Sequence, residues 1–321
     1  SRLSFGLAVG LAESLVLAGE LERAEIQYDH VLAHAGGTLD TARVLSSKAT
    51  LYTSQSRYEL AVDLALEGLG MLGVRLKPAP GRAAILKELA VLRWRLRGLR
   101  PKDLPGLPEM RDEKRLAAVN LLMDAITPAF MFDKDLVALA VLRMANLSVR
   151  HGNAACSSFG YMFYAMLLAA RFGRYDQAQE YAEAALELNK RFGNSALECK
   201  LRLLYGSTIR HWRGPLAEDL RLLKQAHAAG RQTGDLVYAR YAAYFRVHYM
   251  LIKGDTLERV ERQAEEYVQF AETTRNEVAA GMVRLARQMA LALKGQTFER
   301  AGLDSPDFSE DRHTEIGRAH V

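Results

Sequence analysis

The sequence predicts an all-α protein built as a solenoid of antiparallel helix pairs. A six-residue pattern (small residue, any residue, Tyr or Leu, acidic residue, any residue, Ala) recurs at intervals of roughly 40 residues, which is typical of stacked helical repeats. The clearest copy spans residues 173–178, two more span 19–24 and 56–61, and degenerate copies begin at residues 214 and 254. Only 8 prolines interrupt the 321 residues, and apolar residues recur with helical spacing between the copies.

Each position of this pattern has a structural role in a tight turn between two helices. A residue that tolerates positive φ is expected where the first helix ends. The Tyr or Leu folds back between the helices, the acid lies in the first turn of the second helix, where the helix dipole favours it, and the Ala keeps the crossing close. The structural turn residues predicted in this way are Gly19, Ala24, Tyr58, Ala61, Gly173, Tyr175, Ala178, Gly214 and Gly254. None of them is assigned a ligand.

Helical periodicity then places the elements in order along the chain. The first two pairs are regular, with residues 4–18 against 21–35 and residues 39–54 against 57–72. The pattern breaks at 77–81, resumes as a basic helix over 83–99, and breaks again over 101–108; five of the eight prolines lie in these breaks. Further helices are predicted at 110–126, 134–150, 155–171, 175–191, 195–212, 216–232, 235–252, 256–273 and 276–294.

These elements are expected to form one continuous array, because each unit of a solenoid contacts only its neighbours. The array has repeats over 1–76, a proline-interrupted basic helix and loop over 77–108, and repeats over 109–294. Residues 295–321 are polar and predicted to be disordered. Residues 315–321 match what a widely used sequencing adapter would encode, and the chain lacks an initiator Met. We therefore expect a fragment of a longer protein whose last residues are a sequencing artefact.

Composition indicates a soluble protein, with 49% hydrophobic and 25% charged residues and a net charge of +5. Residues 152–170 carry no charged side chain and approach the length of a membrane span. The polar residues Asn153, Ser157 and Ser158 within that stretch favour a buried helix instead. Cys156 and Cys199 are far apart and suggest neither a disulfide framework nor a metal site, which favours the cytoplasm.

Motifs that carry catalytic chemistry are absent from the sequence. It has no G-x-x-x-x-G-K-[ST] loop, no G-x-G-x-x-G after a predicted strand, no H-E-x-x-H, no C-x-x-C, no kinase H-R-D or D-F-G and no G-x-S-x-G elbow. His30 and His34 could share a metal from one helix face, but solvated helix positions explain them better. We therefore expect no catalytic residue, no cofactor and no metal in this chain.

Two groups of residues are candidates for binding a partner. They are Arg150, His151 and Asn153, and the sequence-adjacent Arg210, His211 and Trp212. In the second group, an aromatic ring and cations could hold an anionic or peptide partner. Cations also complement a helix C-terminus, and this structural role is the favoured one. The basic stretch over 82–115 could meet nucleic acid, but a solvated face or an acidic domain of the same polypeptide is preferred.

Several phrases resemble the tetratricopeptide-like (TPR-like) region of large bacterial multidomain signalling proteins. They are LPEM at 107–110, LRMANLSVRHGN at 142–153, FGRY at 172–175 and IRHWRGPL at 209–216, and residues 58–74 fit the same family. The resemblance spans about residues 5–290 and implies TPR-like helix pairs in a right-handed superhelix. Proteins of this family carry an AAA/STAND-type ATPase module, often after a Ser/Thr kinase domain. A GAF domain and a sensor histidine kinase commonly follow the array.

The resemblance implies a non-catalytic regulatory scaffold whose partners are proteins or intramolecular ATPase and kinase domains. The catalytic residues of those domains lie outside this chain, and none of its eight histidines is assigned as a phosphorylation site. Two alternatives remain open: the repeat region of a STAND-type transcriptional activator, and a stand-alone adaptor or small-ligand binder. No nucleic acid and no membrane are expected as partners.

Overall fold

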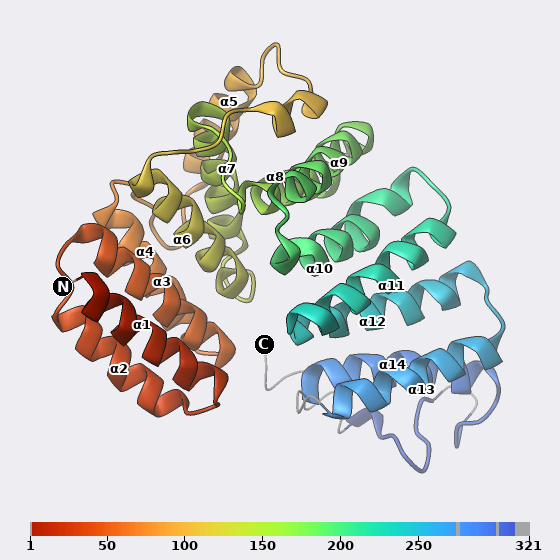
Figure 1. Ribbon diagram of the computed structural model, residues 1–321. Coiled ribbons are helices and arrows are strands. Elements are labelled where there is room, and N and C mark those ends of the chain that lie inside the picture. Colours follow the sequence, from red (N-terminus) through yellow and green to blue (C-terminus); the bar gives the residue numbers. More distant parts are fainter. Residues whose placement is uncertain (1, 274–276, 300–301, 312–321) are drawn as a thin grey trace. The chain divides into compact units, whose positions relative to one another are not determined.

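The computed structural model describes residues 2–273, 277–299 and 302–311. Every regular element in these ranges is a helix, which confirms the predicted all-α class (Figure 1). The chain divides into two compact units, Ser1–Tyr164 and Ala165–Val321, and the division falls inside helix α8 (Ser157–Phe172). The sequence did not predict a boundary at this place.

In the first unit, the early helices form successive hairpins (Figure 1). Helix α1 (Arg2–Leu17) packs on α2 (Leu21–Ala33), and α3 (Thr38–Ser54) packs on α4 (Tyr58–Met71). The order then changes, because α3 and α4 pack on α6 (Glu113–Ala129), while α5 (Arg82–Arg95) packs on α7 (Lys134–His151). Helix α5, which follows the proline-broken segment, therefore does not continue the series of hairpins.

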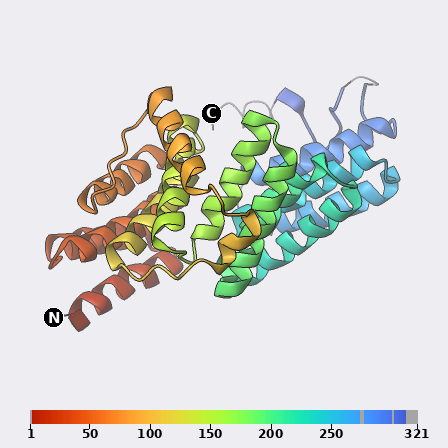
Figure 2. The ribbon, with the colours of Figure 1, turned by 90° about the horizontal axis from the view of Figure 1, so that it is seen from above.

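In the second unit, each helix packs on the next, and Figure 2 shows them alongside one another. Their bounds are Tyr175–Phe192 for α9, Ser195–Leu204 for α10, Leu216–Thr233 for α11, Leu236–Lys253 for α12, Leu257–Thr273 for α13 and Glu277–Leu293 for α14. Helix α12 also contacts α14. Apolar residues of α12, α13 and α14 form one core that includes Val247, Val260 and Val283.

The turns between helix pairs have the predicted backbone at most copies of the pattern. Gly19, Gly173 and Gly254 have φ of +79°, +60° and +81°, and Ser56 takes the same place with φ +60°. The alanines that close the pattern, at positions 24, 61 and 178, are fully buried against the helix crossing. Gly214 is different, because its φ is not positive.

The helix predicted over 195–212 is not continuous. α10 ends at Leu204, a π-helix runs over Tyr205–Ile209, and a 3₁₀ turn follows over Arg210–Trp212. The hydroxyls of Ser207 and Thr208 donate to the carbonyls four residues earlier, at 2.7 Å and 2.5 Å, and such bonds bend a helix. The insertion changes where the helix ends, which is why Gly214 needs no left-handed conformation.

A short backbone bridge ties the proline-rich loop to the end of α7. The Asn153 amide donates to the Pro108 carbonyl at 2.8 Å, and the Met110 amide donates to the Asn153 carbonyl at 2.9 Å. The Asn153 side chain donates to the Leu104 carbonyl at 2.8 Å and accepts from the Tyr161 hydroxyl at 2.9 Å. Every polar group of Asn153 is therefore used inside the first unit.

The polar residues in the uncharged stretch serve contacts with α7. The Ser157 hydroxyl lies 2.7 Å from that of Ser148 and accepts from the Ala154 amide at 2.9 Å. Gly160 faces Met144 so closely that an added Cβ would lie 2.6 Å from its sulfur. In the part of the chain that the structure describes, no helix has both the length and the apolar character needed to cross a membrane.

Part of the region predicted to be disordered is ordered. Ser305 and Phe308 form an antiparallel bridge, and Gln288 of α14 donates to the Leu303 carbonyl at 2.6 Å. Residues 302–311 therefore differ from the expectation, because their backbone finds partners within the segment and on α14. Residues 300–301 and 312–321, which include the adapter-like end, lie outside the described residues.

Candidate functional site

The second unit brings together the residues around Trp212. The 3₁₀ turn that follows the π-helix carries Arg210, His211 and Trp212. The start of α9 supplies Tyr175 and Asp176, and the start of α11 supplies Glu218. We refer to Tyr175, Asp176, Arg210, His211, Trp212, Arg213 and Glu218 as the Trp212 corner.

An exposed aromatic stack marks the surface of the Trp212 corner. The rings of Trp212 and Tyr175 lie 4.8 Å apart between centroids with an interplanar angle of 22°. Trp212 remains 54% exposed although it is stacked. Arg213 pairs with Asp176 at 2.5 Å beside the stack. Tyr175 was predicted as a plug between helices, and the structure shows that it is half-buried and serves as the platform for Trp212.

Arg210 is held inward by contacts within the second unit. Its side chain is 11% exposed, pairs with Glu218, and lies 3.6 Å from a carboxylate oxygen of Asp219. Its guanidinium also donates to the Pro215 carbonyl at 3.2 Å. A Cβ at Gly214 would lie 2.9 Å from this guanidinium, so a side chain there would require the Arg210 side chain to shift. Arg210 is thus engaged within the second unit, and its candidate role in partner binding stays a prediction. The turn role predicted for Gly214 is corrected, because its φ is not positive.

Asp219 is a fully buried carboxylate beneath the corner. Its residue exposure is 0%, and within the described residues neither carboxylate oxygen has a hydrogen-bond partner. Burial raises the pKa of Asp219 to about 6, although the charge of Arg210 opposes this rise. Ionised Asp219 is therefore a costly group that Arg210 compensates in part.

His211 points into the same region of the second unit. Its Nδ1 lies 3.2 Å from the Tyr249 hydroxyl, which donates to the Ser207 carbonyl at 2.8 Å. Burial lowers the pKa of His211, so neutral imidazole is favoured. Burial also raises the pKa of Tyr249 to about 12, with a contribution from the charge of Asp219. Of the three sequence-adjacent candidates, Trp212 is the one the structure leaves open to a partner.

The buried carboxylate makes a specific prediction for stability against pH. The folded pKa of Asp219 is above its unfolded value, so folding takes up a proton between about pH 4 and pH 6. The contribution of this residue to stability therefore grows as the pH falls through 6 and is lost as the pH rises above it. Between pH 7.5 and pH 4.5 the gain is about 2 kcal/mol.

Urea unfolding of the wild type and of Asp219→Asn at these two pH values measures the effect. The variant lacks the titrating carboxyl, so its stability relative to the wild type should improve by about 2 kcal/mol between pH 4.5 and pH 7.5. Parallel pH profiles for the two proteins would show that Asp219 titrates normally in the folded state.

The candidates of the first unit lie in a polar cluster at the end of α7. Arg150 is exposed. Asn153 is 1% exposed, and its backbone groups form the bridge to Pro108 and Met110. Burial, together with the cations of Arg115, Arg150 and Arg95, lowers the pKa of His151. Asn153 is therefore engaged inside the first unit, and the candidate partner-binding roles of Arg150, His151 and Asn153 stay predictions.

The first unit also contains a charged network that the sequence did not indicate. Arg95 donates to the carbonyl and the side-chain oxygen of Asn146 at 3.0 Å each. Asn146 donates in turn to the carbonyl of Glu88 at 3.0 Å and to its carboxylate at 2.9 Å. Buried Asn146 thereby links α5 to α7.

Other reactive groups do not form a catalytic arrangement. Burial raises the pKa of Cys156 to about 12 and that of Cys199 to about 12, which disfavours the thiolate. Among the described residues, no three His, Cys, Asp or Glu side chains lie close enough to hold a metal ion. His34 directs Nδ1 to the His30 carbonyl at 2.8 Å, so one of its ring nitrogens is already engaged.

Sequence reasoning missed Asp219, although the sequence contained a signal for it. Asp219, Leu223, Ala226 and Gly230 recur with helical spacing, and all four are buried on one face of α11. An acid on an apolar stripe is a candidate for a buried charge. The stack of Tyr175 on Trp212 had no such signal, because these residues come from different helices.

No protein-family model matches the chain, and a comparison with curated proteins gives no significant match.

Proposed function

We propose that this chain is a non-catalytic regulatory scaffold that binds proteins through a TPR-like array of helix pairs wound in a right-handed superhelix. The observation that carries the proposal is the exposed stack of Trp212 on Tyr175 at a helix turn. Tryptophan is enriched among the residues that dominate the energy of protein–protein binding. The flanking pair of Arg213 and Asp176 provides the polar rim that such surfaces have.

The successive hairpins of both units support a repeat architecture, in which each helix pair can pass a change in packing to the next. We propose further that the chain is a fragment of a large bacterial signal-transduction protein, with an ATPase module and Ser/Thr kinase or sensor histidine kinase domains outside it. The cytoplasm is the proposed compartment, which the two buried free cysteines support.

The Trp212 corner predicts the outcome of a binding experiment with the proposed partner. Trp212→Ala should weaken binding of the separately purified ATPase module of the parent protein at least tenfold, because it removes a stacked aromatic anchor. Trp94→Ala is the matched control, since Trp94 is 67% exposed in the first unit and outside the corner. Calorimetric titration of the wild type and both variants measures the affinities. Equal affinities for all three proteins would remove the corner from the interface.

The regulatory role is tested in the complete parent protein. Deletion of residues 1–295 should change its ATP hydrolysis or phosphoryl transfer, since the array is proposed to bias those domains. If both activities are unchanged by the deletion, regulation by this region is rejected. A helix-turn-helix domain downstream, in place of GAF and histidine-kinase motifs, would favour a transcriptional activator instead.

A further inference from the structure

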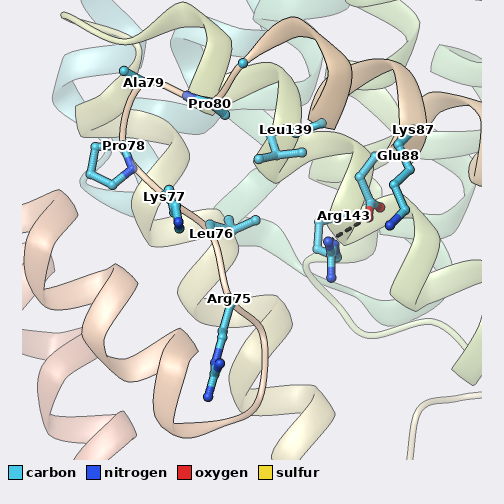
Figure 3. A pocket seen from close by; sticks show the side chains of 12 residues that line it. Arg75, Leu76, Lys77, Pro78, Ala79, Pro80, Lys87, Glu88, Leu139 and Arg143 are labelled. Atoms are coloured by element: carbon cyan, nitrogen blue, oxygen red, sulfur yellow. Dashed lines mark ion pairs between the residues drawn. The ribbon is translucent and has the colours of Figure 1, made fainter.

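A pocket of about 380 Å³ lies in the first unit, apart from every residue of the Trp212 corner (Figure 3). One wall is the loop after α4, residues 75–81, and another is the first part of α5, with Ala84, Lys87 and Glu88. Leu139 and Arg143 of α7 complete the lining. The pocket is a separate feature, so an inference about it does not rest on the proposed function.

The loop that forms the first wall is anchored at several points. Val74 is buried, and its amide donates to the Leu69 carbonyl at 2.8 Å. The Ala79 amide donates to a carboxylate oxygen of Asp133 at 2.8 Å, and Pro80 is buried. The other carboxylate oxygen of Asp133 accepts from the Leu136 amide at 2.8 Å and caps α7. The wall is therefore pre-formed, and both carboxylate oxygens of Asp133 accept hydrogen bonds from backbone amides.

The charges that line the pocket are strongly unbalanced. The lining contains four cationic residues, Arg75, Lys77, Lys87 and Arg143, and one carboxylate, Glu88. In Figure 3 the Arg75 side chain extends away from Glu88. One oxygen of Glu88 pairs with Arg143 at 2.6 Å, and the other accepts from the Asn146 side chain at 2.9 Å. Among the four lining cations, Arg143 is the one that Glu88 pairs with.

Three of the four cations remain uncompensated. Within the ranges that the structure describes, Arg75, Lys77 and Lys87 make no hydrogen bond or ion pair through their side chains. Figure 3 shows Lys77 on the loop, Lys87 on α5, and the ion pair between Arg143 and Glu88. Arg143, by contrast, is held by its ion pair with Glu88. The lining of the pocket thus has positive charge that no ion pair within the chain neutralises.

We propose that this pocket binds a small phosphate-bearing anion with two adjacent phosphate groups. Cations from separate walls can each bind a phosphate oxygen, and lysine serves phosphate as a point charge. The start of α5 borders the pocket, and the positive end of its dipole acts in the same direction. The pocket volume lies within the range of small-molecule binding sites. A pocket of this size cannot hold a folded protein.

Calorimetric titration with inorganic pyrophosphate at constant ionic strength tests the proposal. The wild type should bind one equivalent saturably, and Lys77→Gln/Lys87→Gln should weaken binding at least tenfold. The matched control is Lys102→Gln/Lys114→Gln, which removes the same charge from exposed lysines of the first unit that do not line the pocket. The control should keep the affinity of the wild type.

Both double variants should unfold at the wild-type temperature, because exposed positions contribute little to stability. If pyrophosphate binding is weakened equally in the two double variants, the loss comes from the lower overall charge of the protein and not from the pocket. This result would overturn the proposal. Absence of saturable binding to the wild type at millimolar pyrophosphate would also overturn it.

Discussion

Replacement of Gly152 by alanine is expected to destabilise the first unit by at least about 3 kcal/mol. Gly152 ends α7 with φ +99° and ψ +166°, a region that essentially only glycine occupies. An added Cβ would lie 2.5 Å from the Pro108 carbonyl oxygen, which is backbone and cannot rotate away. The Pro108 backbone must then move, and its hydrogen bond from the Asn153 amide is lost.

Thermal unfolding and limited proteolysis measure this effect. The loop over 97–112 should become sensitive to protease, because its attachment to the end of α7 is weakened. Gly73→Ala is the matched control, since Gly73 also has positive φ, at +81°, but an added Cβ there meets nothing within 4 Å. Gly73→Ala should lower the free energy of unfolding by only about 1 kcal/mol, which is the cost of placing a residue with a Cβ at positive φ. Similar losses in both variants would show that contact with Pro108 is unimportant.

Replacement of Arg210 by methionine is expected to destabilise the second unit by about 3 kcal/mol or more at pH 7.5. The change keeps much of the side-chain volume but removes the cation that lies 3.6 Å from buried Asp219. An uncompensated carboxylate then remains in a fully buried position. The loss should shrink at pH 5, because a protonated Asp219 no longer needs a counter-charge.

A double-mutant cycle separates this electrostatic effect from lost packing. The double variant Arg210→Met/Asp219→Asn should recover most of the stability that Arg210→Met loses, because no charge is left buried. Urea unfolding of the four proteins at pH 7.5 supplies the coupling free energy. If the double variant is as unstable as Arg210→Met alone, the contacts of Arg210 with Glu218 and Pro215 carry its role instead.

Helix positions could be predicted well from the sequence alone. The helix predicted over 175–191 is observed as Tyr175–Phe192, and the one predicted over 134–150 as Lys134–His151. The spacing of apolar residues and the glycines at the turns are local signals, so they can be read from the sequence without knowledge of the fold. The family resemblance and the function that it implies stay predictions.

The failures of sequence reasoning have a common cause, which is contact between distant residues. Asn153 was a candidate for partner binding, but its polar groups are used by Pro108 and Leu104, which lie far earlier in the sequence. Gly214 fits the turn pattern, but the π-helix at Tyr205–Ile209 moves the helix end and leaves Gly214 as space for Arg210. Neither outcome can be read from local periodicity.

The sequence by itself determined that the chain is helical and where most helices reverse, because spacing, proline and glycine act within a few residues. It also supplied Trp212 as a candidate for binding. Only the tertiary structure decided which candidate stays exposed, which carboxylate is buried, and which cations line a common pocket. These properties depend on the packing of separate helices. Burial in that packing changes the free energy of a charged group far more than the residues next to it in the sequence do.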